Sequence, residues 1–368
     1  MKFEPLNQGF VSQRTVNTPT AVAAGSRCAL TPEGDLVCTF MVQSALGIND
    51  FVPLLSRSRD KGETWVEEGP LWPELQDKFS LFGSVSRSPS SELFFFGTST
   101  NIDRRGESFW SDATQGMKQC DLYWAKSVNS GRSWTPPTVI PMQIPGTAEA
   151  PGAMCITRDG RWLVCYAPYN TFDPKVVVDR NQVALLYSDD HGKTWIQTSM
   201  LRFSEIHSGA AEAWIIELTD GKLLGTCWQM DHSVDRDYPN PYALSLDRGN
   251  TWLPPKSTGI QGQSVALAAL PNARALFAYS QRKHGERGIW LAVVKPTESQ
   301  FTVECNQIVW RAETTTQTDS PPEHSQWQDF SFGEPSVTLL DEETVFVTLW
   351  CVQPSGRGIR YVRLRMVK

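Results

Sequence analysis

The sequence predicts an all-β fold, a single six-bladed β-propeller that spans residues 1–368. Two observations predict it. A short motif recurs four times at intervals of about 60 residues, and pairs of strand-like segments joined by glycine turns precede the motifs. Regular repetition of one supersecondary unit is typical of closed rings and solenoids. At about 61 residues for each unit, the 368 residues make six blades.

The repeated motif reads S-x-D-x-G-x-T-W. Its four copies begin at Ser58, Ser127, Ser188 and Ser245. Asn129 and Ser133 replace the Asp and Thr in the second copy. The carboxylate accepts hydrogen bonds from backbone N–H groups of a tight turn, and the glycine supplies a positive φ. We therefore expect each motif to form the turn between the third and fourth strands of a blade, with a structural role.

This motif resembles the Asp-box, or BNR repeat, of sialidases and related propellers, and the resemblance covers nearly the whole chain. It implies that the four boxes lie on the outer rim, away from an active site in the central funnel. Trp310 stands where a fifth box would place its tryptophan, although the rest of that box is missing. The N-terminal segment from Gly9 to Arg14 is expected to pair with the late strand GIRYVRLRMV and to close the last blade.

The composition restricts the partners. A net charge of -6 argues against nucleic acid and anionic membrane, because either would require a basic face. No apolar run is long enough to span a membrane, and the N-terminus carries no secretory signal. The eight cysteines form no CxxC pair, which argues against zinc. We interpret them as buried thiols in a reducing compartment and expect a cytoplasmic location. No cofactor motif is present, and the sequence does not indicate an oligomeric state.

The innermost strands of four blades begin with small residues around a polar one. These starts read GTAEAPGAM (Glu149), GAAEAWII (Glu212), GQSVALA (Gln263) and FGEPSVTL (Glu334). Charged residues at the centre of a propeller are costly unless they are paired or used. A solvated funnel that holds them without a function is the open alternative. Grouped carboxylates are what glycosidic cleavage needs, because one must be protonated and another ionised.

Further positions resemble the sialidase active site. Glu212 resembles the glutamate that activates the family's nucleophilic tyrosine, and Asp50 stands where the acid/base aspartate is expected. Arg287 resembles the third arginine of the carboxylate-binding triad. The resemblance implies catalytic roles for Glu212 and Asp50.

The departures from that pattern are equally informative. The family's Arg-Ile-Pro motif is absent, and Arg27 is out of register. Trp228 or Gln229 takes the place of the second arginine, and Glu334 or Phe332 that of the tyrosine. Because three arginines hold a sialic acid carboxylate, we expect a chain that diverges from true sialidases.

What remains resembles the exo-acting arabinan hydrolases, six-bladed propellers that use two glutamates from neighbouring blades. Glu149 and Glu212 fit that layout, with Glu334 to hold a hydroxyl or tune a pKa. The resemblance implies an exo-acting glycoside hydrolase for an oligosaccharide other than a sialoside. Which glutamate attacks stays open.

Several side chains are candidates for binding the saccharide. They are Arg287, His207, Trp228, Tyr166, Gln263, Tyr279 and Arg27. Trp110 and Trp327 could also stack on sugar rings, and Arg282 could bind an acidic sugar.

Two other functions are consistent with the sequence. A polysaccharide lyase would use His207 or Tyr166 as the base and Arg287 to neutralise a uronate. A propeller that binds carbohydrate without catalysis is the other, because a shared fold proves no function.

Overall fold

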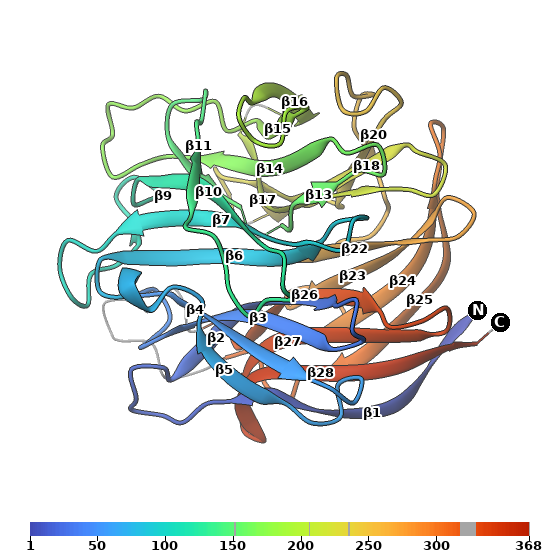
Figure 1. Ribbon diagram of the computed structural model, residues 1–368. Coiled ribbons are helices and arrows are strands. Elements are labelled where there is room, and N and C mark those ends of the chain that lie inside the picture. Colours follow the sequence, from blue (N-terminus) through green and yellow to red (C-terminus); the bar gives the residue numbers. More distant parts are fainter. Residues whose placement is uncertain (151, 206, 235, 317–328, 368) are drawn as a thin grey trace.

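The computed structural model describes residues 1–150, 152–205, 207–234, 236–316 and 329–367. The strands form six antiparallel sheets of four or five strands and one small two-stranded sheet. Figure 1 shows these sheets following one another around a ring, with the first (blue) beside the last (red). The predicted six-bladed β-propeller is therefore confirmed. Within the described ranges, no helix is long and apolar enough to cross a membrane.

The first three blades follow the chain in order. Blade 1 consists of β2 (Val22–Leu30), β3 (Leu36–Gln43), β4 (Val52–Ser58) and β5 (Val66–Pro70). The short 3-10 helix η1 (Pro73–Leu75) leads into blade 2. Blade 2 consists of β6 (Phe79–Arg87), β7 (Leu93–Asn101), β10 (Cys120–Ser127) and β11 (Thr138–Ile140). Blade 3 consists of β12 (Thr147–Glu149), β13 (Cys155–Ile156), β14 (Trp162–Tyr169), β15 (Gln182–Ser188) and β16 (Ile196–Arg202).

The last three blades complete the ring. Blade 4 consists of β17 (Ser208–Glu217), β18 (Leu223–Asp231), β19 (Arg236–Asp237), β20 (Pro241–Ser245) and β21 (Lys256–Ser257). Blade 5 consists of β22 (Val265–Leu270), β23 (Arg274–Gln281), β24 (Gly288–Pro296) and β25 (Phe301–Arg311). Blade 6 consists of β26 (Phe332–Leu339), β27 (Thr344–Gln353), β28 (Gly356–Val367) and the N-terminal β1 (Lys2–Gln13).

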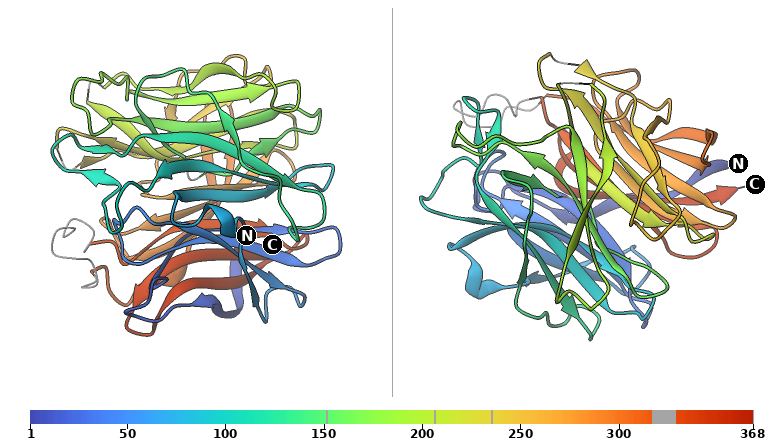
Figure 2. Two further views of the ribbon diagram at one scale, coloured as in Figure 1. Left: turned by 60° about the vertical axis from the view of Figure 1, so that its left-hand side comes forward. Right: turned by 90° about the horizontal axis from the view of Figure 1, so that it is seen from above.

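The ring is closed by the two ends of the chain. β1 pairs antiparallel with β28, from Lys2 opposite Val367 to Gln13 opposite Gly358. The N- and C-termini accordingly lie side by side in Figure 1 and in both views of Figure 2. This pairing covers the outer edge of β28 along its whole length.

The four boxes form the turns between third and fourth strands, as the motif predicts. In the first box Ser58 Oγ accepts from Gly62 N at 2.7 Å, and Asp60 Oδ1 accepts from Thr64 N at 2.8 Å. A hydrogen bond from the Thr64 hydroxyl and the backbone N–H groups lower the pKa of Asp60 to about 2. The expectation for Trp310 is wrong. The β24–β25 turn falls at residues 297–300, and Trp310 lies near the end of β25.

The hydrophobic core is divided into clusters that lie between adjacent blades. Trp65 of the first box packs against Phe346 of blade 6, with ring centroids 5.8 Å apart. Trp195 of the third box joins the cluster between blades 2 and 3. Each of these boxes therefore anchors its blade to the preceding one.

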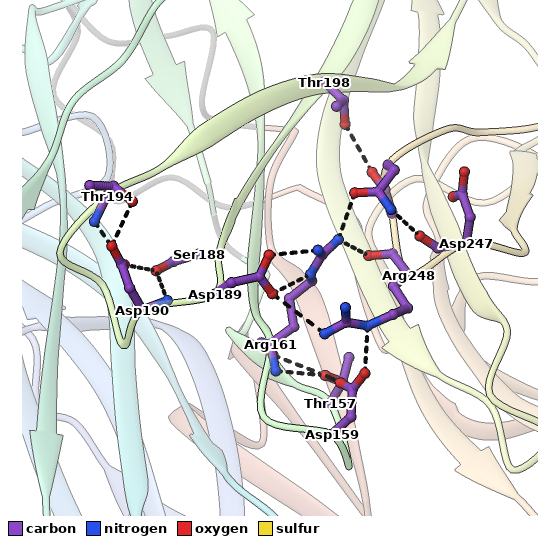
Figure 3. A network of polar contacts seen from close by, with 12 residues as sticks. Thr157, Asp159, Arg161, Ser188, Asp189, Asp190, Thr194, Thr198, Asp247 and Arg248 are labelled. Carbon is purple, nitrogen blue, oxygen red and sulfur yellow. Dashed lines mark hydrogen bonds and ion pairs between the residues drawn. The ribbon is translucent and has the colours of Figure 1, made fainter.

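Buried arginines add polar links between blades. Figure 3 shows Arg161, which precedes β14 and is 5% exposed, between two turns of blades 3 and 4. Its Nε and Nη2 donate to both carboxylate oxygens of Asp189, at 2.8 and 2.6 Å. Its Nη1 donates to the Arg248 carbonyl and to Asn250 Oδ1, both at 2.9 Å. Arg57 makes the equivalent link from blade 1 to the carbonyl of Ser130 in the second box, at 2.9 Å.

We predict that Arg161→Met lowers the free energy of unfolding by about 2–3 kcal/mol, because it removes the four charged hydrogen bonds that link the turns of blades 3 and 4. Urea denaturation measures the change. The matched control is Arg202→Met, which breaks only the exposed ion pair with Asp179 and should cost less than about 1 kcal/mol. Equal losses in the two variants would contradict the role given to Arg161.

Candidate active site

A cavity of about 520 Å³ lies at the centre of the ring, and all six blades contribute to its lining. Aromatic side chains dominate the lining: Phe51, Phe82, Phe109, Trp110, Tyr169, Trp228, Phe330 and Trp350. The polar groups include Glu149, Glu212, Glu334 and Arg282. An apolar pocket with a few converging polar groups is the usual form of a small-molecule site.

The innermost strands of blades 1, 4 and 6 share one irregularity. Each has a β-bulge in which one extra residue is inserted opposite its partner strand: between Ala24 and Arg27, between Ala211 and Trp214, and between Gly333 and Ser336. Bulges re-aim side chains and are frequent beside active sites. The bulges therefore give three blades the same local geometry at the cavity.

A left-handed residue opens each bulge. In blade 1 it is Gly25, with φ of 62°, but in blades 4 and 6 it is Glu212, with φ of 54°, and Glu334, with φ of 44°. This conformation suits glycine and costs other residues on the order of 1 kcal/mol. Strained residues of this kind gather at functional sites. Two glutamates thus stand where the backbone alone would favour glycine.

The three glutamates each reach into the next blade. Glu149 Oε2 accepts from the backbone N of Glu212 at 2.8 Å, and Glu212 Oε1 accepts from Ser264 Oγ at 2.6 Å. Glu334 Oε2 accepts from the backbone N of Gly25 at 2.6 Å. Glu212 Oε2 is buried and has no hydrogen-bond partner within the described part of the chain. These bonds fix the positions of the three carboxylates in the lining of the cavity.

Burial and mutual repulsion favour the protonated carboxyls. Burial raises the pKa of Glu149 well above its usual value, and the charge of Glu212 raises it further. The same two causes raise the pKa of Glu334 to about 7. Burial also raises the pKa of Glu212, but the Ser264 hydrogen bond and the charges of Arg282 and Arg27 oppose that rise. Burial thus raises the pKa of all three carboxyls, and only for Glu212 do a side-chain hydrogen bond and two arginine charges lead the opposing contributions.

Two buried arginines offset the negative charge. Arg27 is 2% exposed, and its Nη1 donates to the carbonyls of Ser26 and Glu334, at 2.7 and 3.2 Å. Its guanidinium lies 4.9 Å from the Trp214 ring centroid. Arg282 lines the cavity, with its guanidinium 4.3 Å from the Phe330 ring centroid.

The structure brings six of the sequence-predicted residues into the cavity: Glu149, Glu212, Glu334, Trp228, Trp110 and Arg282. Arg27 and Gln263 are buried next to these residues but do not line the cavity. Asp50 lies between the lining residues Asn49 and Phe51, and its carboxylate accepts from Ser44 Oγ at 2.5 Å. Burial raises the pKa of Asp50.

The other predicted residues are not brought to the cavity. Tyr166 and Tyr279 are buried inside blades, where their hydroxyls bond Gln197 and Asn306 at 3.1 Å. His207 and Arg287 are exposed and do not line the cavity. Trp327 lies outside the described residues.

Sequence reasoning missed most of the aromatic wall and a buried carboxylate, Asp237. Tyr169, at the end of β14, lines the cavity in place of Tyr166 on the same strand. The sequence did offer one signal for Tyr169, its place at the end of a predicted strand, because residues at strand ends lie at the mouth of the ring. Over the described ranges, no three His, Cys, Asp or Glu side chains come together to hold a metal ion.

Comparison with known proteins agrees with the fold and the boxes. The chain belongs to the family of BNR repeat-like domains, whose pattern matches residues 106–330, more than half of the chain. No curated protein matches it.

Solved structures share the fold at low sequence identity. A protein of unknown function from Dyadobacter fermentans is 18% identical with a TM-score of 0.73, over 99% of both chains. The Hadza microbial sialidase Hz136 is 17% identical with a TM-score of 0.66, over 94% of this chain and 66% of that one. A Penicillium chrysogenum α-L-arabinanase solved with arabinobiose is 12% identical with a TM-score of 0.64, over 98% of both chains. The chain is thus a BNR-repeat propeller that shares its fold with these proteins.

We predict that Glu334→Gln makes the fold more stable than the wild type as pH rises. The raised pKa means that Glu334 is protonated in the folded chain up to about pH 7, whereas it ionises near 4.5 when unfolded. Ionisation therefore removes stability between these values, by up to about 3 kcal/mol. Glutamine keeps an oxygen that can accept from Gly25 N. Urea denaturation between about pH 5 and pH 8 measures the difference.

The control for this experiment is Glu342→Gln, a change of an exposed glutamate in the β26–β27 turn. Its stability should follow the wild type at every pH. A constant difference between Glu334→Gln and the wild type across the range would contradict the raised pKa.

Proposed function

We propose that this chain is an exo-acting glycoside hydrolase that releases neutral sugars from an oligosaccharide. The observation that carries the proposal is the set of three glutamates, Glu149, Glu212 and Glu334, that converge in one aromatic-lined cavity. Two of them occupy strained bulge positions. The fold relatives named above include a sialidase and an arabinanase, which supports an activity on glycosidic bonds.

The environments of the glutamates give each one a role. Glu149 is the general acid, because burial and the nearby charge of Glu212 keep it protonated. Glu212 is the ionised partner that attacks the anomeric carbon or activates water, because Ser264 and two arginines favour its charge. We assign that step to Oε2, the carboxylate oxygen that makes no hydrogen bond within the described residues. Glu334 holds a substrate hydroxyl or adjusts the charge of Glu212.

The contacts of the two cationic side chains that line the cavity, Lys118 and Arg282, support a neutral substrate. Lys118 Nζ contacts Glu107 Oε1 at 2.5 Å and Asp103 Oδ2 at 2.8 Å. The Arg282 guanidinium lies between the rings of Trp228 and Phe330, 5.5 and 4.3 Å from their centroids. The sialidase-like clamp of three arginines is therefore not part of this proposal, whereas the aromatic side chains offer surfaces for sugar rings.

The excursion at residues 102–119, which contains β8 (Trp110–Ser111) and β9 (Gly116–Met117) and walls the cavity, supports the proposed exo action. The excursion is tied to blade 1, where Asn49 Nδ2 donates to Glu107 Oε1 at 2.8 Å. It is also tied to blade 3, where Asn170 Nδ2 donates to the Thr114 carbonyl at 2.8 Å. We therefore expect the excursion, fixed at both ends, to admit the end of an oligosaccharide rather than its middle.

The lyase alternative is less well supported. Its base and neutraliser would be His207 or Tyr166 and Arg287, yet none of the three lines the cavity. The expected cytoplasmic location stays part of the proposal, on the strength of eight free cysteines, most of them buried in strands. Cell fractionation tests it.

We predict that Glu212→Gln lowers kcat on the order of 10³-fold on every glycoside that the wild type cleaves, as loss of the ionised carboxylate requires. Glu149→Gln should lower kcat as strongly on natural oligosaccharides but far less on aryl glycosides with acidic leaving groups, which need no general acid. The assay is turnover of a panel of neutral aryl glycosides and oligosaccharides, with uronate-containing substrates included.

Glu342→Gln is the control and should keep wild-type kcat. Turnover that survives Glu212→Gln would contradict the assignment of that residue. Saccharide affinity without turnover in the wild type would indicate a binding propeller, and a product with ultraviolet absorbance would indicate a lyase.

We also predict that the products are small and uniform from the first minutes of the reaction, because only chain ends enter the cavity. Chromatography of a digested linear oligosaccharide measures this. The same oligosaccharide blocked at its non-reducing end is the control and should resist cleavage. A spread of intermediate lengths at early times would contradict exo action.

A further inference from the structure

A buried carboxylate lies behind one wall of the cavity, at the junction of blades 4 and 5. It belongs to Asp237 at the end of β19, and its side chain is 2% exposed. Asp237 Oδ1 accepts from Trp228 Nε1 at 3.0 Å. Asp237 Oδ2 accepts from Gln263 Nε2 at 2.9 Å and lies 3.2 Å from His284 Nε2. Lys283 Nζ also lies 3.9 Å from Asp237 Oδ1. Four partners thus compensate a charge that would be costly to bury alone.

Two of these partners lead directly to the cavity. Trp228 lines it, and Gln263 Oε1 accepts from the backbone N of Arg282, another lining residue, at 2.8 Å. The Arg282 guanidinium in turn lies 5.5 Å from the Trp228 ring centroid. Asp237 itself is not part of the lining. It therefore supports the wall formed by Trp228 and Arg282 without reaching the space that a ligand would occupy.

The chemistry of sugar binding makes this support important. A sugar ring packs its C–H face against an aromatic face, so affinity depends on how the ring is oriented. An indole held only by packing can change its rotamer, whereas one whose N–H is bonded to a buried carboxylate is fixed at its polar end.

We propose that Asp237 is a positioning residue, which holds the Trp228 indole and the Arg282 segment in place as the platform for a neutral sugar ring. This inference rests on the proposed function, and it extends that function by assigning a residue that touches no substrate. Gln263 and His284 are the groups that keep the Asp237 carboxylate in place.

The first test does not depend on turnover. The indole N–H resonance of Trp228 is assigned by its loss in Trp228→Phe. Asp237→Asn puts an amide where two acceptor oxygens stood, so this resonance should shift and exchange with solvent at least about tenfold faster. The control is Asp121→Asn, which changes an exposed carboxylate on β10. In this variant the Trp228 indole resonance should stay unchanged. An unchanged resonance in Asp237→Asn would overturn the proposal.

The second test uses the aryl glycoside that the wild type cleaves best. Asp237→Asn should raise KM about tenfold and leave kcat within about twofold, because only the platform is disturbed. In the Trp228→Phe background the same change should raise KM less than about twofold. A loss of kcat at constant KM, or full additivity of the two changes, would overturn the proposal. If the wild type cleaves no glycoside, the proposed function fails, while the indole measurement still decides whether Asp237 positions Trp228.

Discussion

The hydrogen bonds that run from the glutamates of one blade to the next are the interaction on which the site depends. Glu149 bonds the backbone of Glu212, and Glu334 bonds the backbone of Gly25. They are possible only because the innermost strands begin with small residues, so that adjacent blades approach closely. The bulges then turn Glu212 and Glu334 towards the axis. The strained bulge residues thus both bring the carboxylates together and form hydrogen bonds between adjacent blades.

This arrangement has an electrostatic consequence. Three carboxyl groups share an aromatic-lined space with Arg282, and Arg27 is buried beside them. Their mutual repulsion separates the protonation states of Glu149 and Glu212, as glycosidic cleavage by an acid and an ionised carboxylate requires. The outer boxes contribute nothing to this chemistry. Asp60 and its counterparts bond their own turns, and their low pKa reflects that structural role.

Sequence reasoning reached the fold because the box is a local device. Its hydrogen bonds lie within seven residues, so the pattern around Asp60 specifies the turn by itself. The glutamates were found for a similar reason, since they occupy the same register in repeated units. Arg287 was chosen for its resemblance to a sialidase arginine and Tyr166 for its expected place in the funnel, but neither lines the cavity. Tyr169 does, and so does Arg282, which the sequence had offered for an acidic sugar. Which face of a strand end meets the axis depends on bulges and on blade twist, and neither is visible in a single sequence. The hydrogen bonds that tie the excursion at residues 102–119 to blades 1 and 3 join residues far apart in the sequence, so they could not be predicted either.

The most direct test of the account is a titration of the glutamate carboxyl groups by nuclear magnetic resonance of the isotope-labelled protein, with Glu149, Glu212 and Glu334 each assigned by substitution. The account predicts that Glu334 titrates near pH 7 and that the pKa of Glu149 is raised well above its ordinary value by burial and by the charge of Glu212. If all three ionised near the ordinary value for glutamate, about 4.3, the cavity would hold three independent solvated carboxylates. The assignment of an acid and its ionised partner would then be wrong.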